Sequence, residues 1–435
     1  VHVADSISAL LRQVGRLTVA TNPHRSGAEG AAHTRQTEGG DTMRRLAEAT
    51  RSGLVVTGAC YPRGDLVEIQ ARIVDPWQDE VRQTVDAVSA PRSDPASAVE
   101  SLSQQVAGTL ALHFENLVPL GLSRPVPLAA VQEYTGAMEH LRPSSREAAF
   151  ARLQRALEID PEFNLARGRL LRWYMWTGMY REAEVELEVL ESHLSDMTRY
   201  DRAWVRAWRA ELEGRPLNVL RALRAAVELA PDSYWARNNM GAWAISNNRP
   251  RETVEVLTGI PFDWTSGTSA HVQRPFANLC FAHHLLGDDE AVLRLAAKSL
   301  EHFPDAVVFY GLQANVLGVA GRFEEMNQML EKSLAVRWHT RTSAGVSYTF
   351  TARELRAHGH RAESLELAEK AVRWFADRPG ETEREPWHSL AALNAAERWG
   401  EARSVAERLA RENPDGIRFL GLLGVLEARV GNAVA

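Results

Sequence analysis

The side chains of this chain that could do chemistry are better suited to binding than to reaction. Arginine and tryptophan anchor protein interfaces because each removes a large planar surface from water. Asparagine can donate to a peptide backbone and accept from it. The candidate binding residues, placed by the helical repeat described below, are Arg169, Arg172, Trp176, Trp204, Trp208, Asn238, Asn239, Asn278, Phe281 and His284.

The same side chains have a second interpretation. Tryptophan commonly fills gaps between packed helices, so the aromatic residues could serve packing alone, and so could the pair Asn238–Asn239. Substituting Asn239 and Arg172 and measuring affinity for a partner, with helicity unchanged, would separate the two interpretations.

No catalytic motif emerges from the residues. The sequence has neither Gly-x-Ser-x-Gly nor His-Glu-x-x-His. The acidic runs Glu324–Glu325 and Asp288–Glu290 fall at the start of expected helices, where a negative charge favours the helix dipole. We therefore expect no enzyme activity, no catalytic residue and no cofactor.

Metal and disulfide chemistry is not indicated either. Cys60 and Cys280 fall in different expected domains, and no Cys-x-x-Cys or His-x-x-x-His pair exists. His283 and His284 are adjacent, and neighbours on a helix point in different directions. We expect no metal site.

Composition narrows the class of protein further. The 435 residues are 45% hydrophobic and 24% charged, with a net charge of −6, so a basic nucleic-acid footprint is not expected. No apolar run reaches the roughly 18 residues of a membrane span. The chain begins at Val1 and breaks off at Ala435 within an expected repeat, so we interpret it as a region of a longer polypeptide whose compartment is unknown.

The elements that must position the candidate residues are repeated helices. Short amphipathic segments recur, each closed by a proline, at Pro161, Pro231, Pro304 and Pro414. These prolines lie about 70, 73 and 110 residues apart, which is two, two and three units of about 35. Small residues such as Ala156 recur within the units. Such residues are expected where paired helices approach closely.

This period and these small residues resemble the tetratricopeptide repeat. The resemblance covers residues 128–435, as about eight units and a partial ninth that starts at Ile417. It implies an all-α superhelix, or α-solenoid, whose concave groove is lined by the first helix of each pair. Two inserts, Pro261–Thr268 and Phe375–Glu385, depart from the repeat and are expected to form loops.

Residues 1–118 predict a small α+β domain in the order αβαβββα. Leu66–Val74 alternates apolar and polar side chains, which indicates a half-buried antiparallel strand within a three-stranded meander. The first helix and strand are expected at Ala4–Val14 and Arg16–Ala20. Residues 119–127 are proline-rich and predict a semi-rigid linker.

The stretch from Leu46 to Pro76 resembles the amino-terminal domain of the Tol-system protein TolB. The matching residues are Leu46, Ala47, Gly53, Gly58, Gly64, Asp65, Gln70 and Asp75. Such domains often stand between a bacterial signalling module, such as a Ser/Thr kinase, a cyclase or a winged-helix regulator, and a tetratricopeptide array. The resemblance therefore implies the carboxy-terminal region of a multidomain signalling protein.

Three functions fit these features. The first is a non-catalytic sensory or regulatory region that captures a protein or peptide in the groove. The second is a structural scaffold or self-association element. The third is binding of a small molecule by the first domain.

Overall fold

The computed structural model describes residues 40–50, 52–77, 80–114, 126–139, 146–259, 270–336, 342–380, 386–412 and 417–431. The chain forms two compact units. The first comprises Val1–Leu141, Glu147–Trp173 and Val185–Thr198; the second comprises Arg142–Arg146, Tyr174–Glu184 and Arg199–Ala435. The division falls among the first helices of the array, and the domain boundary at 118–128 stays a prediction.

The first unit contains the predicted three-stranded meander. The strands are β1 (Val55–Arg63), β2 (Leu66–Asp75) and β3 (Glu80–Pro91), hydrogen-bonded in the antiparallel order β1-β2-β3. Arg63 pairs with Leu66, so only Gly64 and Asp65 form the turn. Gly64 has a φ of 61°, a left-handed conformation that glycine adopts without strain.

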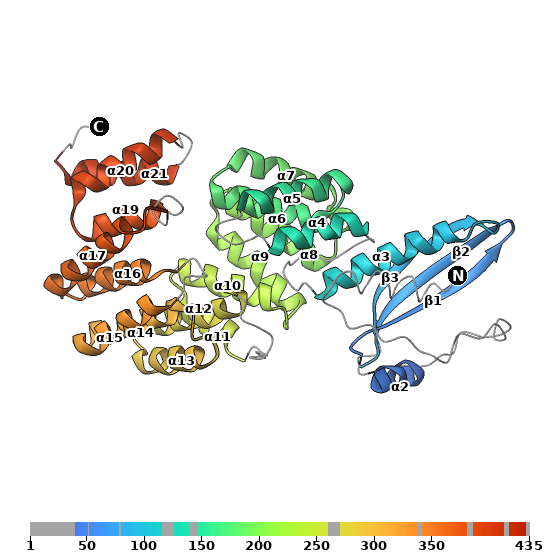
Figure 1. Cartoon of the computed structure of the whole chain (residues 1–435), viewed down its shortest axis with the longest axis horizontal. Coiled ribbons are helices and arrows are strands. Elements are labelled where there is room, and N and C mark those ends of the chain that lie inside the picture. The colour runs from blue at the N-terminus through green and yellow to red at the C-terminus, as the bar shows by residue number, and fades with distance from the viewer. Residues whose placement is uncertain are drawn as a thin grey trace. The chain divides into compact units, whose positions relative to one another are not determined.

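One face of the sheet is covered by α3 (Ala96–Phe114), which lies along it in Figure 1. Alternation directs Ile69, Ala71 and Ile73 of β2 to this face, where they share a core with Val99 and Leu102 of α3. Helix α2 (Gly40–Thr50) precedes β1. The predicted helix at 4–14 and strand at 16–20 lie outside the described residues.

The rest of the described chain is helical. Antiparallel pairing of successive helices gives hairpins formed by α4 (Leu128–Glu139) with α5 (Arg146–Ile159), α6 (Asn164–Thr177) with α7 (Tyr180–Ser192), α8 (Arg199–Leu212) with α9 (Pro216–Leu229), α10 (Tyr234–Ser246) with α11 (Pro250–Leu257), α12 (Ala270–Leu285) with α13 (Asp289–His302), α14 (Val307–Val319) with α15 (Phe323–Ala335), α16 (Ala344–Ala357) with α17 (Arg361–Ala376), and α19 (Pro386–Ala395) with α20 (Trp399–Glu412). Helix α21 (Ile417–Arg429) follows, and the short helix η3 (Leu194–Asp196) follows α7. The predicted fold class, a small α+β domain followed by an all-α array of helical hairpins, is confirmed.

Every hairpin from α6–α7 onward turns through one residue in the left-handed conformation, whereas the turn between α4 and α5 lies outside the described residues. That residue is Gly178, Gly214, Asn248, Gly287, Gly321, Gly359 or Glu397, each with φ between 55° and 89°. The next amide then donates to a carbonyl five residues back, as Arg322 does to Leu317 at 2.8 Å. This bond caps the first helix of each pair and fixes the direction in which the second helix leaves.

Small residues let the two helices of a hairpin approach closely. A Cβ atom on Gly241 of α10 would lie 3.1 Å from the Leu257 side chain of α11. In the next hairpins, Ala314, Ala352 and Ala368 are fully buried. The predicted close approach through small side chains is therefore present in the second unit.

One detail of the predicted organisation is corrected. Phe375, expected to open an insert, is buried within α17, because its ring packs in the core around Leu355 and Leu367. Val126 is buried, and its carbonyl lies against Gly108 of α3. The linker at 119–127 stays a prediction, because most of it lies outside the described residues. Pro414 and the insert Pro261–Thr268 lie outside the described residues.

Candidate protein-binding surface

Five first helices of hairpins in the second unit form a continuous wall. Helix α14 contacts α12 on one side and α16 on the other, while α10 and α19 continue the series. We call α10, α12, α14, α16 and α19 the A wall. Because each successive helix reverses direction, these alternate helices run the same way.

The register between α14 and α16 confirms this direction. Gly311 faces Ser347, Asn315 accepts a 2.7 Å hydrogen bond from Thr351, and Gly318 faces Leu355. In these three pairs, a higher residue number on α14 goes with a higher residue number on α16. The two helices are therefore parallel, and residues 36 or 37 apart lie at one level.

Helix α14 is apolar all round because other helices surround it. Its sequence, VVFYGLQANVLGV, contains no charged residue, and most of its side chains are buried. Only Tyr310 and Gln313, together with Val308 and Val319, keep partial exposure. Leu317, one turn beyond Gln313, is 5% exposed although it follows the same face.

Leu317 is buried because it packs in the core with Ala314 and Leu355. A side-chain pair also bridges the two helices that flank α14. The Nε2 atom of His284 on α12 lies 3.0 Å from a carboxylate oxygen of Glu354 on α16. These helices belong to hairpins two apart, so the pair spans the intervening α14. The carboxylate raises the pKa of His284, and the hydrogen bond to His284 lowers the pKa of Glu354.

Exposed aromatic rings stand one helical turn before this bridge. Phe281 of α12 is 39% exposed and Phe350 of α16 is 52% exposed. By the register above, Phe350 lies at the level of Gln313 on α14. Phe281 stands on α12, which contacts α14 on its other side. The two open rings therefore stand on the helices that flank α14, and Leu285 (53% exposed) lies on the same stripe of α12 as Phe281.

The structure assigns the other predicted binding residues to different environments. Trp204 and Trp208 of α8 are 4% and 3% exposed, with ring centroids 6.1 Å apart. Their burial favours the gap-filling interpretation. Arg169 and Arg172 of α6 are half-buried, and Trp176 at the end of that helix is 38% exposed.

The predicted asparagines make contacts within the array. The Nδ2 atom of Asn278 donates to Oδ1 of Asn238 at 3.1 Å, which joins α12 to α10. Asn239 is half-buried and donates to the carbonyl of Trp235 in its own helix. Of the ten predicted residues, Asn238 and Asn278 are thus brought together, whereas Phe281 and His284 share the surface beside Glu354.

Sequence reasoning missed Phe350, Gln313, Leu285 and Glu354. A signal existed, because aligning the A helices on their left-handed turn residues places Phe350 nine residues before Gly359 and Leu285 two before Gly287. The exposure of each position could not be read from that alignment, since it depends on the neighbouring helices.

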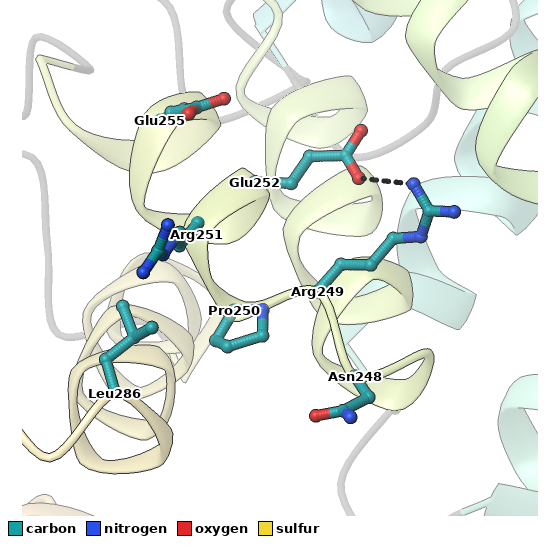
Figure 2. Close-up of a pocket in the computed structure, with 7 residues that line it drawn as sticks. All are labelled: Asn248, Arg249, Pro250, Arg251, Glu252, Glu255 and Leu286. Carbon is teal, nitrogen blue, oxygen red and sulfur yellow. Dashed lines mark ion pairs between the residues drawn. The ribbon is translucent and has the colours of Figure 1, made fainter.

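A separate hollow lies at the turn between α10 and α11 (Figure 2). It is lined by Asn248, Arg249, Pro250, Arg251, Glu252, Glu255 and Leu286. Arg249 pairs with Glu252 at 3.8 Å, and Arg224 reaches the same carboxylate. The two arginines and two glutamates of the lining cancel in formal charge, so the hollow presents no dominant charge to an ion.

Among the described residues, no three histidine, cysteine, aspartate or glutamate side chains are grouped to hold a metal ion. Burial raises the pKa of the Cys280 thiol to about 12. Asp288 accepts from the amide of Ala291 and caps α13, as predicted for that acidic run. Within the same described residues, no helix is long and apolar enough to cross a membrane.

Comparison with known proteins gives likeness in fold only. No protein-family model and no curated protein matches the chain. Among solved structures, a tetratricopeptide repeat protein from Parabacteroides merdae is 12% identical, with 61% of this chain and 99% of that chain covered and a TM-score of 0.38. PilF of Pseudomonas aeruginosa is 16% identical, with 59% of this chain and 97% of that chain covered and a TM-score of 0.32. Yeast Tom70 is 12% identical, with 73% of this chain and 68% of that chain covered and a TM-score of 0.43.

Proposed function

We propose that the array is a non-catalytic binding region that takes a protein or peptide segment on the A wall. The observation that carries this proposal is the pair of exposed rings, Phe281 and Phe350, on the two helices that flank α14. Exposed aromatic side chains held on packed helices lose little conformational freedom when a partner covers them. They are therefore suited to anchoring a ligand.

The surface defines the chemistry of the partner. The rings and Leu285 favour an apolar side chain, and the amide of Gln313 can donate to and accept from a backbone. The guanidinium of Arg353 lies 5.8 Å from the centroid of the Phe350 ring and stays exposed. An acidic residue beside the apolar anchor would therefore be favoured.

Selection from a random peptide library tests the proposal. Peptides that bind the wild-type chain should lose at least about tenfold in affinity on Phe281→Ala and on Phe350→Ala, as expected when a central anchor is removed. Tyr180→Ala and Leu217→Ala, at positions 50% and 58% exposed on second helices of their hairpins, are the controls and should bind normally. Selected peptides that bind all four variants equally would place the binding surface elsewhere.

We also propose that this region belongs to a larger bacterial signalling protein, in which the first domain is TolB-like. The support is the resemblance of Leu46–Pro76 together with the helix–meander–helix order of α2, β1–β3 and α3. The sequence of the complete reading frame tests this: a kinase, cyclase or winged-helix module before Val1 is the expected result, and its absence would remove the signalling context.

The small-molecule alternative has one feature in its favour. A hollow of the first domain is lined by Ala47, Glu48, Ser52, Gly53 and Trp77. Trp77 is 50% exposed, and its indole N–H donates to the carbonyl of Ser52. Quenching of Trp77 fluorescence in a metabolite panel, compared in wild-type and Glu48→Ala chains, tests this alternative.

A further inference from the structure

The bridge between His284 and Glu354 lies beside the rings proposed to anchor a partner. On α12, His284 follows Phe281 by three residues, and on α16, Glu354 follows Phe350 by four. Residues three or four apart are neighbours on the surface of a helix. A segment that covers both rings must therefore pass close to the bridge.

The proton on His284 is held by Glu354. The Nε2 atom of His284 lies 3.0 Å from the carboxylate, whereas its Nδ1 atom is buried and has no hydrogen-bond partner among the described residues. The hydrogen bond to Glu354 raises the pKa of His284 above its ordinary value of 6.5. The same contact lowers the pKa of Glu354, so the carboxylate stays ionised while His284 titrates.

Charged and titratable groups surround His284 on every neighbouring helix except α14, which has no charged residue. They are His283 on α12, Asp288 and Asp289 at the start of α13, and Arg353, Glu354 and His358 on α16. Of these side-chain types, only histidine ordinarily changes charge between about pH 6 and pH 9. A change of charge over this range is therefore a change at a histidine.

The charge beside the rings depends on His284. When His284 is protonated, its charge cancels that of Glu354, and the guanidinium of Arg353 leaves one positive charge 5.8 Å from the centroid of the Phe350 ring. When His284 is neutral, Glu354 and Arg353 cancel each other instead. An acidic side chain of a bound segment therefore meets more attraction when His284 is protonated.

We propose that protonation of His284 strengthens the binding of an acidic peptide segment on the A wall. This regulation rests on the proposed binding function of that wall. The segment is held at mildly acidic pH and is released as pH rises and His284 loses its proton. Because the two equilibria are linked, the bound segment in turn favours the protonated form of His284.

Two versions of one peptide test the proposal. A library-selected peptide that depends on Phe281 and Phe350 is made with a glutamate beside its apolar anchor, and again with a glutamine there. Fluorescence anisotropy measures both dissociation constants at about pH 6 and pH 9, at one low ionic strength because salt screens the attraction. For the glutamate peptide the dissociation constant should rise about threefold to tenfold from the lower to the higher pH, as expected for one charge at a water-exposed site. The glutamine peptide should bind alike at both.

Substitutions assign the effect to one histidine. His284→Gln should remove the pH dependence, whereas the matched controls His283→Gln and His358→Gln should keep it. Glu354→Gln leaves the charge of Arg353 unopposed, so this variant should bind the glutamate peptide at the higher pH as tightly as the wild type does at the lower pH. Circular dichroism at both pH values checks that each variant is folded.

The outcomes separate this regulation from the binding function. Selected peptides that bind normally to Phe281→Ala and Phe350→Ala would refute the binding function, and the regulation with it. Binding that needs the rings but is equal at the two pH values would overturn the regulation alone, and so would a pH dependence that survives His284→Gln. If His284→Gln fails to fold, weak binding of the glutamate peptide to Glu354→Gln at the higher pH decides against it.

Discussion

The contact between His284 and Glu354 is the residue-scale feature with the clearest consequence for stability. It joins helices two hairpins apart, and both side chains are largely buried, with 14% and 28% exposure. Its charged neighbours are Asp289, which raises the pKa of His284, and Arg353 and His358, which lower the pKa of Glu354. The pair should therefore stabilise the folded chain in a limited pH window.

The signs of the two shifts define that window. The pKa of His284 is raised in the folded chain, so its contribution is complete below the ordinary value of 6.5 and is lost as pH rises through the folded pKa. The pKa of Glu354 is lowered, so its contribution is complete above the ordinary value of 4.5 and is lost as pH falls through the folded pKa. Both contributions are complete between pH 4.5 and 6.5.

Glu354→Gln should therefore cost about 1 kcal/mol within this window, because the amide keeps the shape but loses the charge. Above it the cost should shrink, since neutral His284 can still donate to an amide oxygen. Denaturant unfolding from pH 4 to 9 measures this profile. Glu324→Gln, at an exposed position of α15, should show no such profile. A cost independent of pH would show that the charge of the pair contributes nothing.

The left-handed turn residues support a second residue-scale prediction. Gly321→Ala should destabilise the chain by about 1 kcal/mol, because φ at this position is 74° and a Cβ atom disfavours that conformation. Asn248→Gly, at φ 55°, should be neutral or stabilising. Urea midpoints of both variants against the wild type measure the difference. Equal midpoints for Gly321→Ala and the wild type would argue against strain at the turn.

At the scale of the element, glycine inside helices has a different role. Gly345 of α16 lies under the rings of α17, where an added Cβ atom would collide with Trp374 and would lie 3.0 Å from Phe375. Although alanine favours a helix over glycine by up to about 1 kcal/mol, displacing two rings should cost more, so Gly345→Ala should destabilise by about 1 to 2 kcal/mol.

Gly400→Ala is the matched helical control for this prediction. A Cβ atom on Gly400 of α20 would meet no described atom within 4 Å, so the substitution should be neutral or slightly stabilising. Thermal unfolding followed by far-ultraviolet circular dichroism measures both variants. A stable Gly345→Ala variant would mean that α16 and α17 are not held at the close distance that the structure shows.

Elements were the part of the fold that sequence could predict well. Helix ends follow local signals, and the turn glycines at 178, 214, 287, 321 and 359 are themselves in the left-handed conformation that ends a helix. The meander followed from the alternation in β2. The extension of α17 through Phe375 was missed, because an aromatic pair beside a charged segment gives no local signal of burial.

Surfaces were harder to predict, because exposure depends on helices far away in the sequence. Trp204 and Trp208 have the types and spacing of interface anchors, yet both are buried. Phe350 is open although its neighbours Thr349 and Thr351 are buried. The bridge from His284 to Glu354 spans 70 residues and depends on the register of three helices, which no periodicity in the sequence reports.

At the scale of the whole molecule, the array should respond locally to damage. A hairpin contacts mainly the hairpins before and after it, and stability in such arrays is close to a sum of local terms. Leu367 of α17 is 2% exposed. It shares its core with Leu355 of its own hairpin and with Leu330 of the preceding hairpin. Truncating it removes contacts from a few neighbouring helices only.

Leu367→Ala should therefore lower stability by about 2 to 5 kcal/mol at that place and not uniformly. Hydrogen exchange read by mass spectrometry should show lost protection in α14 to α20, while β1, β2 and β3 keep theirs, since their core around Ile73 and Leu102 is separate. Ile73→Ala is the reciprocal control and should deprotect the sheet and α3 but not α16 or α17. If both variants deprotected every segment equally, the chain would unfold as one cooperative unit. The hairpins of the A wall would then not be stabilised locally by their neighbours.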